Sequence, residues 1–252
     1  MKKFLFSAIT LVAFNSHATS TPPEISDSTA SVSVSAGISV GPYRNYSNKV
    51  TPLPMIAYEG SNFFIRGAKS GLKLYDSKSD EISLSASLLP FSFKPKDAER
   101  DSLKNLNERK HSAIAGLSWI HNADWGFTSV TAGQRITGNK KGVIMTAEYG
   151  YPFQLGDTTL LVSTGLEYNN SEMNKNYFGI SSEESIRSGL RRYNPGSGVS
   201  PYLDLLATYP LTNSVDISAG ARLTRLSDAI YNSPMVDDRY MKSFFSSISY
   251  NF

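Results

Sequence analysis

Apolar and polar residues alternate with a period of two along most of the chain, and this alternation restricts the fold more than any other feature. It is clearest in five stretches: 32–40, 82–88, 143–151, 160–168 and 215–223. A helix would repeat its apolar residues about every 3.6 positions, whereas a strand turns alternate side chains to opposite faces. Most of these stretches last about nine to eleven residues, the length that a tilted strand needs to cross a membrane. The sequence therefore predicts an all-β protein.

Two architectures fit alternating strands, and they differ in where the apolar face points. A soluble sandwich or barrel turns it inward, whereas an outer-membrane barrel turns it toward lipid, encloses a polar interior and carries aromatic girdles at both membrane interfaces. Tyrosines lie near predicted strand ends at Tyr149, Tyr151, Tyr168, Tyr202, Tyr209 and Tyr250. Short connections such as 151–157 alternate with long polar ones at 94–110, 169–199 and 227–239. We therefore predict an antiparallel transmembrane β-barrel of the bacterial outer membrane, with short periplasmic turns and long extracellular loops.

The number of strands follows from counting these stretches. Strand patterns cover 31–41, 52–59, 62–76, 80–91, 111–122, 126–136, 142–151, 158–168, 200–209, 214–225 and 240–252. That is an odd number, whereas bacterial single-chain barrels have an even one. The stretch 62–76 is longer than its neighbours and contains Gly67 and Gly71, so we expect a tight hairpin there. This hairpin gives about 12 strands, and losing a strand near 52–66 would give about 10.

The end of the chain alternates strictly and finishes on an aromatic residue. In a membrane barrel the last strand must pair with the first, because an open edge cannot be satisfied in lipid. We expect Phe244, Ile248, Tyr250 and Phe252 to face lipid on this closing strand. A terminal aromatic residue after alternating apolar ones also resembles the sorting signal that the barrel-assembly machinery binds. An edge strand of a soluble sheet is the alternative.

The beginning of the chain has the layout of a secretory signal peptide. Lys2 and Lys3 precede a short apolar stretch, and small residues precede a cleavage point after Ala18. We expect a signal peptide at 1–18 for the Sec pathway, a flexible periplasmic segment at 19–30 and one barrel domain at 31–252. The apolar stretch is too short for a transmembrane helix. These features predict the outer membrane of a Gram-negative cell.

Composition excludes two further classes of protein. The chain has no cysteine, so disulfides cannot stabilise it after export. Its formal charge is +3, and removing Lys2 and Lys3 leaves a mature charge near +1 (3 minus 2). A nucleic-acid-binding protein would carry a larger basic excess. We predict no nucleic-acid partner.

Histidine limits the catalytic chemistry that the chain could carry. His111 and His121 bracket one predicted strand, about 30 Å apart at about 3.4 Å per residue, so they cannot share a site. A hydrolase would have to use His111 alone beside Asp97 or Asp101, but a polar residue at the membrane interface explains His111 better. The sequence shows neither paired histidines at metal-ligand spacing nor a phosphate-binding loop. We predict a protein that is not an enzyme and needs no cofactor or metal.

Charged residues recur on the predicted inward face of the strands. These candidate interior residues are Arg66, Lys73, Glu148, Glu167, Asp204, Asp216 and Arg222. Buried charges must be paired and hydrogen-bonded, and both signs are present. We expect a network that links the strands across the interior, with a selective pore as the alternative.

The predicted loop 94–110 carries mixed charge. Leu103 and Leu106 lie three residues apart, which suits one short amphipathic helical turn. Its lysines and arginines could bind the phosphates of lipopolysaccharide in the outer-membrane lipid. A solvated surface loop is the simpler interpretation.

The segment 177–202 is the most distinctive part of the sequence. It combines aromatic residues, arginines and glycines, so we expect a structured loop that folds over or into the barrel. Arg187, Arg191 and Arg192 could pair with Glu183 and Glu184. The candidate interaction residues are Tyr177, Phe178, Gly179, Ile180, Glu184, Ser188, Gly189, Leu190 and Tyr193.

Several of these motifs together resemble a known family. The motifs are "YFGIS" at 177–181, Glu183 with Glu184, "SGL" at 188–190, Tyr193, "GPYRNYSN" at 41–48, "PLPMIAYEG" at 52–60 and "SPMVD" at 233–237. Over roughly 31–252 the chain resembles the MltA-interacting protein (MipA/OmpV) family of outer-membrane proteins.

The resemblance implies a function that periodicity and composition do not give. It implies a non-enzymatic outer-membrane barrel that acts as a scaffold between a membrane-bound lytic transglycosylase and a bifunctional penicillin-binding protein that synthesises murein. Other members of the family are described as surface adhesins. A small channel, suggested by the charged interior, and a surface adhesin remain the alternatives.

Overall fold

The computed structural model describes residues 29–46, 50–89, 92–138 and 142–252. The predicted signal peptide at 1–18 and residues 19–28 of the predicted flexible segment lie outside this part of the chain. Within the described part, no helix is long and apolar enough to cross a bilayer.

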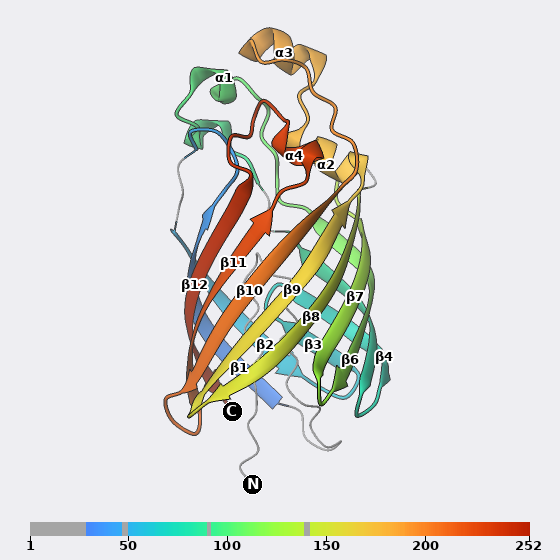
Figure 1. Ribbon diagram of the computed structural model, residues 1–252, viewed down its shortest axis with the longest axis vertical. Helices are drawn as coiled ribbons and strands as arrows, with labels where there is room; N and C mark the ends of the chain where they lie inside the picture. The colour runs from blue at the N-terminus through green and yellow to red at the C-terminus, as the bar shows by residue number, and fades with distance from the viewer. Residues whose placement is uncertain (1–28, 47–49, 90–91, 139–141) are drawn as a thin grey trace.

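Twelve antiparallel strands form a closed barrel, which confirms the predicted fold class (Figure 1). Their bounds are β1 Thr29–Val40, β2 Val50–Glu59, β3 Phe63–Arg66, β4 Lys69–Asp76, β5 Asp80–Leu88, β6 Ala113–Ala123, β7 Gly126–Arg135, β8 Val143–Leu155, β9 Thr158–Asn169, β10 Gly198–Pro210, β11 Val215–Arg225 and β12 Tyr240–Asn251. Each strand pairs with its neighbours in sequence, and β1 pairs with β12. Strand β5 ends at Leu88, earlier than predicted, and residues 90 and 91 lie outside the described part.

The predicted hairpin within 62–76 is present and supplies the twelfth strand. The chain turns at Gly67, where a φ of 62° suits glycine, and separates β3 from β4. A bulge then shifts the β4–β5 register between Lys73 and Tyr75. Because of this extra residue, Leu74 and Tyr75 are both exposed on the wall.

The alternation places apolar side chains outside and polar side chains inside. On β12, Phe244 and Ile248 are exposed, whereas Ser243 and Ser247 are buried. A soluble barrel has the reverse arrangement. Here the outer face of the wall contacts lipid, so its side chains are apolar.

The last strand closes the barrel as predicted. Val34 of β1 lies opposite Ile248 of β12, and Val32 lies opposite Tyr250. The amide of Phe252 donates to the carbonyl of Ala30 over 3.0 Å. The predicted lipid-facing residues of this strand, Phe244, Ile248, Tyr250 and Phe252, are all exposed.

Four aromatic side chains lie over glycines on neighbouring strands and fix the packing inside the wall. A β-carbon on the glycine would lie less than 3.0 Å from the ring in the pairs Phe64–Gly71, Phe127–Gly150, Tyr202–Gly165 and Phe245–Gly220. Each glycine therefore leaves room for one ring.

Both described chain ends and the short turns lie at one end of the barrel, whereas the helices lie at the other (Figure 1). The helices are η1 Pro95–Asp97, α1 Asp101–Lys104, α2 Ser171–Phe178, α3 Ser182–Ser188 and α4 Asp228–Tyr231. All of them belong to the long connections, so this end is the extracellular one.

Candidate functional site

The long connections pack together into one body over the extracellular end of the barrel, which we call the lid. It comprises residues 41–46, 92–112, 170–197 and 226–239. Its apolar core includes Tyr43, Phe93, Leu103, Leu106, Met173, Tyr177, Phe178, Ile180, Ile230, Met235 and Val236. Leu103 and Leu106 lie within this core, so the short amphipathic turn predicted in 94–110 is present.

Local sequence explains why the 170–197 connection is ordered. The Asn170 side chain caps α2 by accepting a hydrogen bond from the Met173 amide, and it also accepts one from the Val143 amide at the start of β8. Ser181 and Glu184 form a reciprocal capping box at the start of α3. Gly189 ends α3 with a φ of 71°, a left-handed conformation that suits glycine.

Glu184 joins α3 to the connection between β5 and β6. Its carboxylate accepts hydrogen bonds from the Arg109 guanidinium at 2.7 Å, the Asn107 amide at 2.9 Å and the Ser181 amide at 3.0 Å. Arg109 also donates to the Gly179 carbonyl. Burial alone would raise the pKa of Glu184, but the two amides and the nearby Arg109 charge together lower it. This carboxylate is therefore an ionised link between two loops.

The pairing predicted within residues 183–192 is wrong. Arg187 donates to the Asn105 carbonyl and to the Asn107 side chain, and Glu184 pairs with Arg109. Both contacts lie between loops that are distant in sequence. A pattern confined to one loop gives no information about such partners.

The candidate interaction residues lie together, but many of them are internal to the lid. Tyr177, Phe178 and Ile180 are buried in its core, and Tyr193 donates its hydroxyl to the Ala229 carbonyl. Gly179, Ser188, Gly189 and Leu190 complete the turns around α3. The apolar side chain that this loop offers to solvent is Ile186, which is 87% exposed.

The predicted interior charges form two clusters on different parts of the wall. In the first, Arg66 lies between Glu59 at 2.8 Å and Glu81 at 2.6 Å. Lys73 bonds Glu59 at 2.6 Å and Asp76 at 2.9 Å. This cluster links β2, β3, β4 and β5.

The second cluster links β8, β10 and β11. The Arg222 guanidinium donates to both carboxylate oxygens of Asp204, one of them at 2.6 Å, and lies 4.2 Å from the centre of the Tyr202 ring. The Tyr202 hydroxyl donates to Glu148 over 2.8 Å. Tyr202 is therefore an interior residue, and its predicted place in the aromatic girdle is wrong.

The two remaining predicted charges lie outside these clusters. Glu167 accepts a hydrogen bond from the Asn169 side chain, and Asp216 accepts one from the Asn251 side chain near the periplasmic end. The interior network thus has separate parts on the two sides of the barrel.

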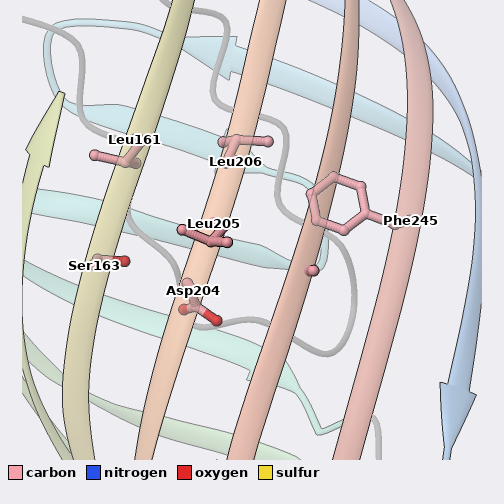
Figure 2. Close-up of a pocket in the computed structure, with 7 residues that line it drawn as sticks. Leu161, Ser163, Asp204, Leu205, Leu206 and Phe245 are labelled. Carbon is pink, nitrogen blue, oxygen red and sulfur yellow. The ribbon is translucent and has the colours of Figure 1, made fainter. Parts of the chain in front are cut away.

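Buried serines line the inner face of the wall between the clusters. Inward serines from six strands, Ser35, Ser83, Ser118, Ser163, Ser218 and Ser243, are each at most 2% exposed. A recess beside the second cluster is lined mainly by apolar residues (Figure 2). Leu161, Leu206 and the ring of Phe245 lie around it, with Asp204 at its lower side in this view. Ion pairs crosslink the inner face of the wall beneath the lid.

The periplasmic rim carries a group that sequence reasoning missed. Asp80 accepts hydrogen bonds from Trp119 at 3.0 Å and from His121 at 2.9 Å. The rings of Trp119, His121, Trp125 and Tyr149 follow one another at centroid distances of 5.9–6.0 Å. We call these four rings the rim ladder. Of this group, the predicted aromatic girdle included only Tyr149. The Asp80–His121 contact was missed because the two residues lie 41 positions apart in the sequence.

This Asp–His pair does not make a hydrolytic site in the described part of the chain. The Ser79 hydroxyl bonds Asp80, and within the described residues no serine hydroxyl hydrogen-bonds to His121. His111 lies at the other end of β6, where its ring nitrogen is 3.3 Å from the Leu89 carbonyl. The described residues also contain no group of three histidine or acidic side chains suited to a metal ion.

Comparisons with known proteins agree with this architecture. Residues 33–252 match the family model described as MltA-interacting protein MipA. The MltA-interacting protein of Escherichia coli K12 is 36% identical over 222 residues, covering 87% of this chain and 90% of the relative. The putative outer membrane protein YiaT of the same strain is 33% identical over 233 residues, covering 91% and 95%.

More distant matches include an outer-membrane protein and a porin structure. The outer membrane protein OmpV of Vibrio cholerae is 24% identical over 195 residues, covering 77% of this chain and 76% of the relative. A NanC porin structure aligns over 87% of this chain and 98% of its own length, with 8% identity and a TM-score of 0.45. On the family match and the two nearer relatives, this chain is an outer-membrane β-barrel that belongs to the MltA-interacting protein MipA family.

Proposed function

We propose that this chain is a non-enzymatic outer-membrane scaffold that holds enzymes of murein synthesis and hydrolysis. The observation that carries the proposal is 36% identity, over 87% of this chain, to a protein named for its interaction with MltA. The partners would be a lytic transglycosylase and a bifunctional penicillin-binding protein. The ion pairs on the inner face support this role, because they link neighbouring strands and a scaffold needs a rigid wall.

The rim ladder is the surface that we assign to the transglycosylase. Trp125 is 51% exposed and Tyr149 is 41% exposed, and both lie at the periplasmic end of the wall. A membrane-bound partner would approach this rim along the membrane from the side. Aromatic side chains of this kind are enriched at the energetic centres of protein interfaces.

A pull-down tests the proposal directly. We would tag the mature chain near its N-terminus, crosslink intact cells mildly, solubilise the envelope and identify the co-purified proteins by mass spectrometry. Strong enrichment of a lytic transglycosylase or a penicillin-binding protein over an unrelated barrel is the expected result. No enrichment would leave the barrel assignment intact and exclude the scaffold function.

A pair of variants then locates the surface. Trp125→Ala should reduce recovery of the transglycosylase about tenfold or more, as expected for an interface anchor. Tyr209→Ala is the matched control, because Tyr209 is a similarly exposed aromatic residue at the periplasmic end of β10. Equal recovery with the two variants would move the contact away from the rim ladder.

Export and assembly belong to the same proposal. The Sec pathway would deliver the chain to the periplasm, and the barrel-assembly machinery would bind the closing strand through Phe244, Ile248, Tyr250 and Phe252. Deleting Phe252 should slow the appearance of folded barrel in the outer membrane. Unchanged assembly of that variant would remove Phe252 from the signal.

A surface adhesin is the second candidate, and the exposure of Ile186 on α3 favours it. Ile186→Asp should then abolish attachment of cells while the barrel stays folded. A small channel is tested by conductance in planar bilayers. The lid over the extracellular end predicts a silent barrel, and steady conductance would overturn that expectation.

A further inference from the structure

The outward face of the barrel wall carries little charge. In the extracellular half of the barrel, the described strands turn two charged side chains outward, Arg225 at the end of β11 and Lys242 near the start of β12. Both are exposed, whereas their neighbours Thr224 and Ser243 face inward and are buried. Arg135, at the extracellular end of β7, is buried as well. The two outward cations are therefore an exception in the described wall.

The strand register brings these two cations together below the lid (Figure 1). Arg225 lies opposite Tyr240, and Lys242 lies opposite Leu223. Arg225 and Lys242 are thus diagonal neighbours on one face of an antiparallel pair, a relation that sets residues about 7–8 Å apart. Both side chains are long enough to reach one anion between them. We call Arg225 and Lys242 the wall cations.

The wall cations lie where the apolar band of β11 and β12 ends. Toward the periplasm, the next outward side chains are Leu223, which is 42% exposed, and Phe244, which is 51% exposed. On the extracellular side, Tyr240 is 41% exposed, and an aromatic ring with a polar hydroxyl is typical of the membrane interface. The wall cations therefore lie at the level where acyl chains give way to lipid head groups.

The protein itself leaves much of this charge unpaired. Among the described residues, Arg225 has no ion-pair partner. Lys242 lies 3.5 Å from Asp238, and these two side chains are 47% and 41% exposed. By contrast, Arg239 pairs with Asp228 at 3.0 Å. The wall cations and Asp238 carry a net charge of +1 (2 minus 1), which is unfavourable beside lipid unless an anion joins it.

The direction and the level of the wall cations identify this anion. They point sideways into the membrane, so the anion belongs to a lipid and not to a solute of the medium. Their level is that of the outer leaflet, whose main lipid in a Gram-negative cell is lipid A. Lipid A carries phosphates on its sugar head group, directly above its acyl chains. Guanidinium and ammonium groups form charge-assisted hydrogen bonds with phosphate oxygens, which are stronger than bonds between neutral groups.

From these observations we infer that Arg225 and Lys242 form a binding site for one phosphate of lipid A. The acyl chains of the same lipid lie along Leu223 and Phe244. The site differs from the predicted lipopolysaccharide contact of loop 94–110, which belongs to the lid. It does not depend on the scaffold function, because it lies at the opposite end of the barrel from the rim ladder.

A matched pair of double variants tests the site. Arg225→Gln with Lys242→Gln removes the wall cations and leaves polar side chains in their place. Arg100→Gln with Lys104→Gln removes the same charge from loop 94–110. Lys104 is a close match for Lys242, because it is also 47% exposed and also pairs with an aspartate. Heat-modifiable migration on gels would confirm that each barrel is folded.

The readout is the binding of bisphosphorylated lipid A, measured by native mass spectrometry of the folded protein in detergent. The wall variant should bind about tenfold or more weakly than the natural protein, because it loses two charge-assisted contacts, whereas the loop variant should change by less than about twofold. Unchanged binding by the wall variant would overturn the site. An equal loss in the two variants would overturn it too, because general surface charge would then explain the binding.

Three further ligands test the nature of the anion. Dephosphorylated lipid A should bind the natural protein as weakly as intact lipid A binds the wall variant. Equal binding of the two lipids by the natural protein would assign the contact to acyl chains and overturn the phosphate site. Displacement of lipid A by inorganic phosphate at equal concentration would assign the site to a free ion. Equally tight binding of phosphatidylglycerol would overturn the assignment to lipid A.

A charge-conserving variant separates charge from side-chain shape. Arg225→Lys with Lys242→Arg keeps both cations, so it should retain most of the affinity for lipid A. An affinity as low as that of the glutamine variant would contradict a site that recognises phosphate by its charge.

Discussion

The lid and the barrel beneath it bury opposite kinds of residue. The lid encloses rings and aliphatic chains such as Phe93, Tyr177 and Met235, as a soluble domain does. The barrel encloses serines and ion pairs such as Arg222 with Asp204, and it exposes its aliphatic residues. The lid therefore buries its apolar residues because water surrounds it, whereas the barrel buries its polar residues because lipid surrounds it.

The difference teaches how each region obtains its stability. The lid gains free energy when apolar area leaves water. The barrel wall is surrounded by lipid, so its strands are held by the closed ladder and by polar contacts across the interior. Substitutions in the lid should therefore loosen the lid alone, whereas substitutions of interior charges should destabilise the barrel.

Breaking the ion pair of the second cluster should have the largest effect. Asp204→Asn leaves a buried guanidinium without its carboxylate, which should cost about 3–5 kcal/mol of unfolding free energy. The double variant Asp204→Leu with Arg222→Met should recover most of this loss, because neither charge remains. Denaturant titration of the barrel in detergent micelles measures both. A single variant as stable as the natural protein would show that the interior is hydrated.

Removing a ring from the lid core should destabilise the lid by a similar free energy but leave the barrel folded. Phe93 is fully buried, so Phe93→Ala should destabilise the lid by about 3–4 kcal/mol. Trypsin should then cleave the lid faster at Arg191 and Arg192, while heat-modifiable migration of the barrel stays unchanged. Loss of the folded barrel in this variant would contradict the separation into two regions.

Neutralising the link between two loops should have an intermediate effect. Glu184→Gln keeps the shape of the side chain but removes the charge paired with Arg109, and should weaken the lid by about 1–3 kcal/mol. Hydrogen exchange should speed up in residues 105–109 and 181–188. Glu183→Gln is the matched control, because the neighbouring Glu183 side chain is exposed. Equal exchange in both variants would remove Glu184 from the link.

Acid should produce the smallest effect. Folding lowers the pKa of Glu184, so its contribution is fully present above the ordinary value of 4.5 and is lost as the pH falls through the folded value. The near-ultraviolet circular dichroism of the lid tyrosines should stay constant from about pH 8 to pH 5 and decline below about 4.5. In Glu184→Gln this part of the decline should disappear. A transition centred near neutral pH would assign it to another group.

Sequence periodicity predicts the barrel well because the residues of each strand alternate between those suited to lipid and those suited to the barrel interior. The alternation in 143–151 and 242–252 depends on lipid on one side and a packed interior on the other, so it is visible without any partner. The hairpin at Gly67 was predictable for a related reason, since an even strand count needed a turn there.

Partners across the sheet could not be predicted in the same way. Its place near a strand end assigns Tyr202 to the girdle, although the alternation puts it on the same inner face as Asp204. Arg109 and Glu184 are 75 residues apart, in two different loops of the lid. Asp80 and His121 lie directly opposite each other on the neighbouring strands β5 and β6, so their contact depends on that single register. Such contacts depend on register and loop packing, which a pattern within one segment does not contain.

The pairing of β1 with β12 has a consequence for the life of the newly made chain. Ser31 of β1 pairs with Asn251 of β12. One edge of β1 therefore stays unpaired until almost the entire polypeptide has crossed the inner membrane. Until β12 arrives, the free edge of β1 stays uncovered in water, where strand edges associate with one another. Holding chaperones in the periplasm are therefore a requirement set by topology, and the last residues delivered control when the hazard ends.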